Sequence, residues 1–80
     1  MGTTEEIYIE PYQIFCTEEI INSVKILKFG ILYKNERGEV IKKVEDISTE
    51  REFVERLTAT LNEENVEVCH LENIVEDAIY

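Results

Sequence analysis

The adjacent pair Cys69-His70 has more potential for chemistry than any other local pattern in the sequence. Together with Cys16 and a carboxylate such as Glu67 or Asp77, it would supply four ligands for a zinc ion. A thiol beside an imidazole also has the residue types of a nucleophile and its general base. The spacing argues against both, because neighbouring residues point in different directions and no C-x-x-C or H-x-x-x-H pattern adds a second ligand pair. We therefore expect Cys69 to pack inward and His70 to bind backbone at the start of a helix.

The acidic residues of the C-terminal half are the second set of interest. Residues 44–80 hold eleven acidic and two basic residues, a net charge of −9, whereas residues 1–43 hold seven acidic and six basic residues, a net charge of −1. These carboxylates lack the D-x-D-x-D-G loop that gathers oxygen atoms around calcium. Carboxylates dispersed in this way usually form a solvated, solubilising face.

Signals for a phosphate or cofactor site are missing from the sequence. The only glycines are Gly2, Gly30 and Gly38, which form no glycine-rich loop. The sequence therefore predicts no catalytic residue, no cofactor and no metal, and a protein that is not an enzyme. The alternative that the residues leave open is a metal-dependent or thiol enzyme around Cys69 and His70.

The net charge of −10 restricts the possible partners. It repels the nucleic-acid backbone and anionic membranes, which excludes both, and it attracts basic proteins. We expect a small protein-interaction module that binds a basic protein or a second copy of itself, with the basic strands of one copy against the acidic helices of the other. A further alternative is an acidic mimic of nucleic acid that occupies a DNA-binding protein. The candidate contact residues lie on the outer surfaces of the predicted helices: Glu55, Glu63, Glu72 and Glu76.

Length and composition indicate one globular domain over residues 1–80. The apolar fraction is 44%, which is ordinary for a folded domain. Residues 1–6 read as a mobile polar leader, and residues 7–11 as an edge strand or an extended lead-in, because Pro11 cannot donate to a ladder. No run of 18 apolar residues and no secretory pattern is present, so we expect a cytoplasmic protein.

Alternating apolar residues predict three strands in the first part of the chain. The strand over residues 24–34 is the clearest, with a fully apolar face, and Gly30 within it indicates a bulge or a close approach of another backbone. Asn22-Ser23 marks the turn before it, and Gly38 takes the left-handed position of the loop after it. The other two strands are expected over residues 12–20 and 39–46.

Apolar residues spaced on a 3.6-residue period predict two helices in the second part of the chain. The first covers residues 47–61 and is capped by Ser48 or by Thr49, and the second runs from Leu71 almost to the C-terminus. Residues 66–69 form a connector or a short fourth strand. The predicted fold class is α+β, a three-stranded antiparallel sheet in β-β-β-α-α order with both helices packed on one face. In the predicted core, Phe53, Leu57 and Leu61 lie buried against Leu27, Phe29 and Ile31.

Several short motifs between residues 29 and 77 resemble a family of small proteins of unknown function from Gram-positive anaerobic bacteria. They are Phe29-Gly30-Ile31, Val44-Glu45-Asp46-Ile47-Ser48, Leu61-Asn62, His70-Leu71 and Ile74-Val75-Glu76-Asp77. The chain departs from this family at Thr49 and Cys69, where the family often has proline. The resemblance implies a bacterial cytosolic origin and a shared fold, and it assigns no activity, cofactor or catalytic residue.

Overall fold

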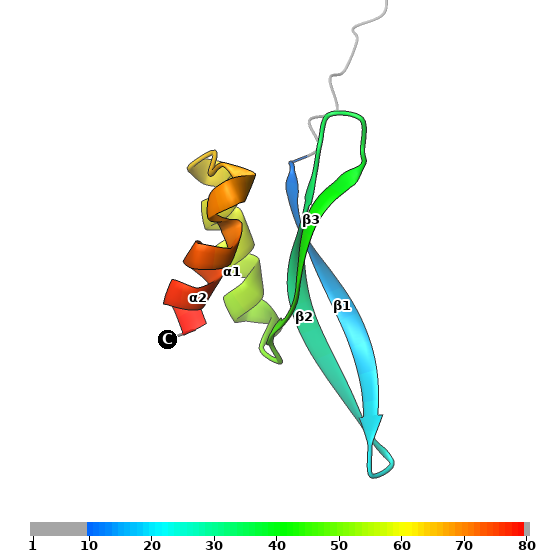
Figure 1. Ribbon diagram of the computed structural model, residues 1–80. Coiled ribbons are helices and arrows are strands. Elements are labelled where there is room, and N and C mark those ends of the chain that lie inside the picture. The colour runs from blue at the N-terminus through cyan, green and yellow to red at the C-terminus, as the bar shows by residue number, and fades with distance from the viewer. Residues whose placement is uncertain (1–9, 80) are drawn as a thin grey trace, which may run out of the picture.

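The computed structural model describes residues 10–79 of the chain. The predicted leader and most of the predicted lead-in, up to residue 9, lie outside the described residues. Three strands are followed by two helices that cover one face of the sheet, so the predicted α+β fold and its element order are confirmed (Figure 1). The elements are β1 (Tyr12–Ile21), β2 (Val24–Lys34), β3 (Val40–Ser48), α1 (Arg51–Glu63), the 3₁₀ helix η1 (Val68–His70) and α2 (Leu71–Ile79).

The sheet is antiparallel, and β2 lies between β1 and β3. Asn22 and Ser23 join β1 to β2 with φ values of 51° and 65°, the left-handed pair that a two-residue hairpin turn requires. In the loop before β3, the Asn35 side chain accepts hydrogen bonds from the N–H groups of Arg37 and Glu39, both at 2.9 Å. Gly38 has a φ of 79°. Both predicted connections are therefore confirmed.

Gly30 marks both a bulge and a close approach of another strand. Phe29 pairs with Ser48 and Ile31 pairs with Val44, so three residues of β3 face Gly30 alone. Asp46, in the middle of these three, has a φ of 52°. A Cβ atom on Gly30 would lie 2.4 Å from the Val44 carbonyl oxygen, which is closer than such atoms approach. Only glycine fits at this crossing.

The first helix begins later than predicted, at Arg51. Its N-cap is Glu50, whose side chain makes no capping hydrogen bond, so both predicted caps are wrong. The reason is that β3 extends through Ser48, whose hydroxyl accepts instead from the Glu50 N–H at 3.0 Å. After the helix ends at Glu63, Asn65 takes a φ of 49°, the left-handed conformation that reverses the chain after a helix.

The core lies between the sheet and the helices. Leu61 is fully buried, but Phe53 and Leu57 are only half-buried, and Leu27 is 42% exposed, so that part of the predicted core is wrong. Thr58 was not predicted to be buried, yet it lies in the core with its hydroxyl donating to the Val54 carbonyl at 2.7 Å. The buried hydrophobic residues are Tyr12, Phe29, Ile31, Ile47, Val54, Leu61, Leu71 and Val75.

Leu27 is exposed because the β1–β2 hairpin is longer than the helices that cover it. An 11-residue strand such as β2 extends about 36 Å, whereas the 13 residues of α1 extend about 20 Å. The turn end of the hairpin therefore projects beyond the helical layer (Figure 1). We call residues 17–28 the hairpin arm.

A side-chain amide fastens the end of α1 to the sheet edge. The Asn62 side chain accepts from the Tyr12 N–H at 2.9 Å and donates to the Tyr12 carbonyl at 2.9 Å, so it pairs with β1 as a neighbouring strand would. The Tyr12 hydroxyl donates to the Val66 carbonyl, and its ring packs edge-on against Tyr33 at 5.0 Å between centroids. Burial raises the pKa of Tyr12, with smaller contributions from Tyr33 and Cys69.

No helix within residues 10–79 combines the length and the apolar character needed to cross a membrane.

Candidate functional site

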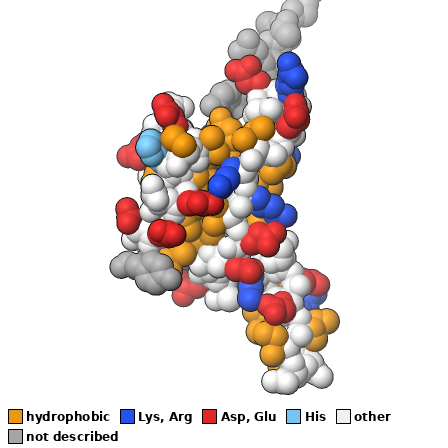
Figure 2. Space-filling model, in the orientation of Figure 1, with side chains coloured by type: hydrophobic (Ala, Val, Ile, Leu, Met, Phe, Trp, Pro, Cys, Tyr) orange, Lys and Arg blue, Asp and Glu red, His pale blue; other side chains and the backbone are white. Residues whose placement is uncertain are grey.

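The helical part of the chain presents a strongly acidic surface. Residues 50–79 hold nine acidic and two basic residues, and all nine acidic residues are exposed. Figure 2 shows acidic side chains spread over the helical layer. We call this set the acidic helical surface: Glu50, Glu52, Glu55, Glu63, Glu64, Glu67, Glu72, Glu76 and Asp77.

The four predicted contact residues fall into two pairs within this surface. Glu55 accepts from Arg51 at 2.6 Å along the same helix, and Glu72 forms an ion pair with Lys42 of β3 at 2.7 Å. Over residues 10–79, no basic side chain lies within ion-pair distance of Glu63 or Glu76. Glu63 and Glu76 therefore differ from Glu55 and Glu72, each of which has a basic neighbour.

Most basic residues of the strands already have acidic neighbours in the same chain. Ion pairs join Lys25 to Glu18 and Lys28 to Glu19, both at 2.6 Å. The hydrogen bond that the Lys28 ammonium donates to the Glu19 carboxylate raises the pKa of Lys28. Lys43 lies 3.4 Å from Glu45, and Lys42 pairs with Glu72 as described above. Four of the six basic residues in the strands and their loops are therefore partly neutralised within the chain.

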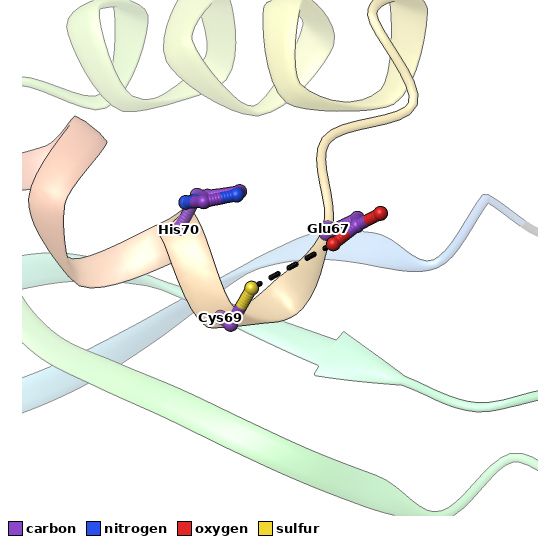
Figure 3. A group of neighbouring side chains, drawn as sticks. All are labelled: Glu67, Cys69 and His70. Atoms are coloured by element: carbon purple, nitrogen blue, oxygen red, sulfur yellow. Dashed lines mark hydrogen bonds between the residues drawn. The ribbon is translucent and has the colours of Figure 1, made fainter.

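The Cys69-His70 pair is arranged differently from the prediction. Cys69 is exposed and does not pack inward. The side chains of Glu67, Cys69 and His70 lie together, with one ligand atom from each within 4.8 Å of the other two (Figure 3). The Cys69 thiol lies 3.8 Å from the Glu67 carboxylate. Cys16 and Asp77, which the rejected zinc-site alternative would have used, do not belong to this group.

The 3₁₀ turn explains why these side chains meet. Residues three apart in a 3₁₀ helix lie on the same side, since each turn takes three residues. Glu67 precedes η1 and His70 ends it, and the His70 N–H donates to the Glu67 carbonyl at 2.9 Å. Residues 66–69 are therefore part of a connector between the two helices, one of the two predicted alternatives, and the strand alternative is wrong. His70 does lie at the entry to α2, as predicted, and its main-chain N–H makes the ordinary bond of the turn.

The hairpin arm is a second surface that sequence reasoning missed. Ile20, Val24 and Leu27 are 74%, 60% and 42% exposed, and Figure 2 shows hydrophobic side chains gathered near the hairpin turn. Where the arm meets the first turn of α1, an open hollow of about 220 Å³ is lined by Ile14, Phe15, Cys16, Leu27, Phe29 and Arg51. An apolar strand pattern predicts a buried face, and it carries no signal for where the covering helix stops.

Comparison with known proteins decides the family. The model of a family of unknown function, DUF6514, matches residues 3–80. The chain belongs to the DUF6514 family. The match extends on both sides of residues 29–77, the span of the motifs that predicted membership of a family of unknown function. No curated protein and no solved structure matches the chain.

Proposed function

We propose that this member of the DUF6514 family is a non-enzymatic binding module that uses its acidic helical surface to capture a basic protein in the bacterial cytoplasm. One observation carries the proposal: nine exposed acidic residues against two basic residues over residues 50–79. Such a field draws a basic protein toward the surface and raises the rate of encounter. It also opposes binding to nucleic acid and to anionic membranes.

Glu63 and Glu76 are the residues on which we expect binding to depend most. Glu63 lies at the C-terminal end of α1, where the helix dipole adds partial negative charge. Within the described part of the chain, neither carboxylate has a basic neighbour that a partner would need to displace. Glu55 and Glu72 contribute less, because each already forms an ion pair.

A different protein is a better partner than a second copy. Pairing of two copies would set the basic strands of one against the acidic helices of the other. Four of the six strand and loop basic residues already bind acidic neighbours in their own chain. An arriving helix would have to compete with these pairs, which reduces the gain from association.

The exposure of the Cys69-His70 region supports a non-enzymatic role. Nucleophilic and acid–base catalysis use a site that excludes water and positions a substrate. Glu67, Cys69 and His70 are all exposed on a turn at the surface, which gives a thiol no such enclosure.

The test is affinity enrichment from a lysate of the source cells with three forms of the protein at low and moderate salt. Glu63→Gln/Glu76→Gln removes two charges from the acidic helical surface. Glu36→Gln/Glu39→Gln removes two charges from the exposed β2–β3 loop and serves as the matched control. We expect a basic protein to be retained by the wild type and the control at low salt, and lost from the helical variant and at moderate salt.

Equal retention by all three forms would contradict the acidic helical surface as the binding site. Two further measurements separate the alternatives. A dimer in sedimentation equilibrium that dissociates with salt would favour a second copy as the partner. Displacement of the captured protein by duplex DNA would favour the nucleic-acid mimic, because a mimic and DNA compete for one site.

A further inference from the structure

We propose that Glu67, Cys69 and His70 form a binding site for a single Zn²⁺ ion on the surface of the chain. The site shares Glu67 with the acidic helical surface, but the proposed partner binding depends chiefly on Glu63 and Glu76, which lie outside it. It rests on the meeting of a carboxylate, a thiol and an imidazole on one short turn, with one ligand atom from each within 4.8 Å of the other two.

The distances between the ligand atoms are close to those of a zinc site. Zinc bonds of about 2.0–2.3 Å in tetrahedral geometry place ligand atoms about 3.3–3.6 Å apart. The Cys69 sulfur already lies 3.8 Å from the Glu67 carboxylate oxygen. Closing the group around an ion therefore requires a shift of at most about 1.5 Å, which rotation of exposed side chains can supply.

The backbone that carries these ligands is fastened at three points. The Val66 N–H donates to the Leu61 carbonyl at 3.1 Å, and the Val66 carbonyl accepts from the buried Tyr12 hydroxyl. The His70 N–H donates to the Glu67 carbonyl at 2.9 Å. Because the turn is already formed, metal binding has to order only the three side chains.

The donor set selects a borderline divalent cation. Sulfur and imidazole nitrogen bind Zn²⁺ well, whereas Mg²⁺ and Ca²⁺ take oxygen ligands and would find one carboxylate here. The surrounding acidic helical surface raises the local concentration of divalent cations. Three protein ligands leave the fourth position of the tetrahedron to water. On binding, the Cys69 thiol releases its proton to the buffer, so affinity increases with pH.

Titration with Co²⁺ under anaerobic conditions, with a phosphine reductant, tests the site. Cobalt replaces zinc in such sites, and a thiolate ligand gives a charge-transfer band in the near ultraviolet. We expect the wild type to show this band with one equivalent of Co²⁺, and Zn²⁺ to abolish it, because zinc binds more tightly than cobalt. The zinc concentration that removes half of the cobalt band then gives the affinity for zinc relative to that for cobalt.

Ligand variants and matched controls assign the residues. Cys69→Ser should eliminate the band, while Cys16→Ser, which removes the other exposed cysteine, should retain it. His70→Gln and Glu67→Gln should weaken binding at least about tenfold, the lower end of the effect of losing a supporting hydrogen bond at a metal site. Glu64→Gln, an exposed neighbour outside the group, should bind as the wild type does.

Circular dichroism of each variant in the absence of metal should match the wild type, because all three ligands are exposed. Absence of the band in the wild type would overturn the proposal. So would a band that survives Cys69→Ser, a stoichiometry of one ion per two chains, or full affinity in Glu67→Gln. None of these outcomes bears on the acidic helical surface as a protein-binding site.

Discussion

Replacing Asn62 with alanine tests how the helical layer is attached to the sheet. The side chain makes two hydrogen bonds of 2.9 Å to the backbone of Tyr12, one as acceptor and one as donor. Each such bond contributes about 1 kcal/mol net, and a partly buried group left without a partner costs more. We therefore expect a loss of about 2–3 kcal/mol in the free energy of unfolding. For a domain of this size, that corresponds to a melting temperature lower by about 8–24 °C.

Asn73→Ala is the matched control for this prediction. Asn73 is an exposed residue of α2, and the same exchange there gains the same helix propensity without removing a bond to the sheet. Thermal unfolding followed by circular dichroism should show a large decrease for Asn62→Ala and little change for Asn73→Ala. Amide hydrogen exchange should also show that the Tyr12 N–H loses protection only in the Asn62 variant. Equal melting temperatures for the two variants would refute the role given to the Asn62 amide.

Three further predictions concern the core and its response to pH. Gly30→Ala should lower the unfolding free energy by about 1–3 kcal/mol or more in urea denaturation, because the new Cβ would meet the Val44 carbonyl. Leu61→Ala should lower the free energy of unfolding by about 2–5 kcal/mol. Leu57→Ala should lower it clearly less, because Leu61 is fully buried and Leu57 only half-buried. Equal denaturation midpoints for the two variants would contradict this packing. The raised pKa of Tyr12 means that the folded state holds the phenol proton more tightly than the unfolded state. The phenol of Tyr12 therefore contributes its full stabilisation below its ordinary pKa of 10.0, and this contribution is lost as the pH rises through the raised pKa of the folded state. Tyr12→Phe, which has no proton to lose, should show a smaller decrease in melting temperature at alkaline pH.

The strands and turns could be predicted because their signals are local. Ten or more residues of near-alternating pattern define β2, and Asn22-Ser23 tolerates the left-handed backbone that a two-residue turn requires. The first residue of α1 could not be predicted as well as the strands and turns. Ser48 and Thr49 both have cap chemistry, but β3 continues through Ser48 because Ile47 and Ser48 still face the sheet across from Phe29 and Gly30.

The errors concern features that depend on distant parts of the chain. Leu27 has the pattern of a core residue, and its exposure follows from the length of β2 relative to α1. The hydrogen bonds of Asn62 could not be predicted, because its partner Tyr12 lies 50 residues away in the sequence. No local signal would have identified that pairing.

The candidate site shows the same division between local and distant information. Charge counts alone located the acidic helical surface, since every acidic residue from 50 to 79 is exposed. The counts could not show that Glu55 and Glu72 are neutralised by Arg51 and Lys42. Nor could a four-residue segment specify the 3₁₀ turn that brings Glu67 and His70 to one side.

Chemical-shift mapping with the captured basic protein tests most directly whether the acidic helical surface is the binding site. Unlabelled partner is added to ¹⁵N-labelled protein at low salt, and the backbone amide shifts are followed residue by residue. We expect the largest changes along the C-terminal half of α1 and along α2, centred on Glu63 and Glu76, and their loss at moderate salt as the charges are screened. Changes confined to the hairpin arm, or changes that persist unaltered in Glu63→Gln/Glu76→Gln, would contradict the proposed function.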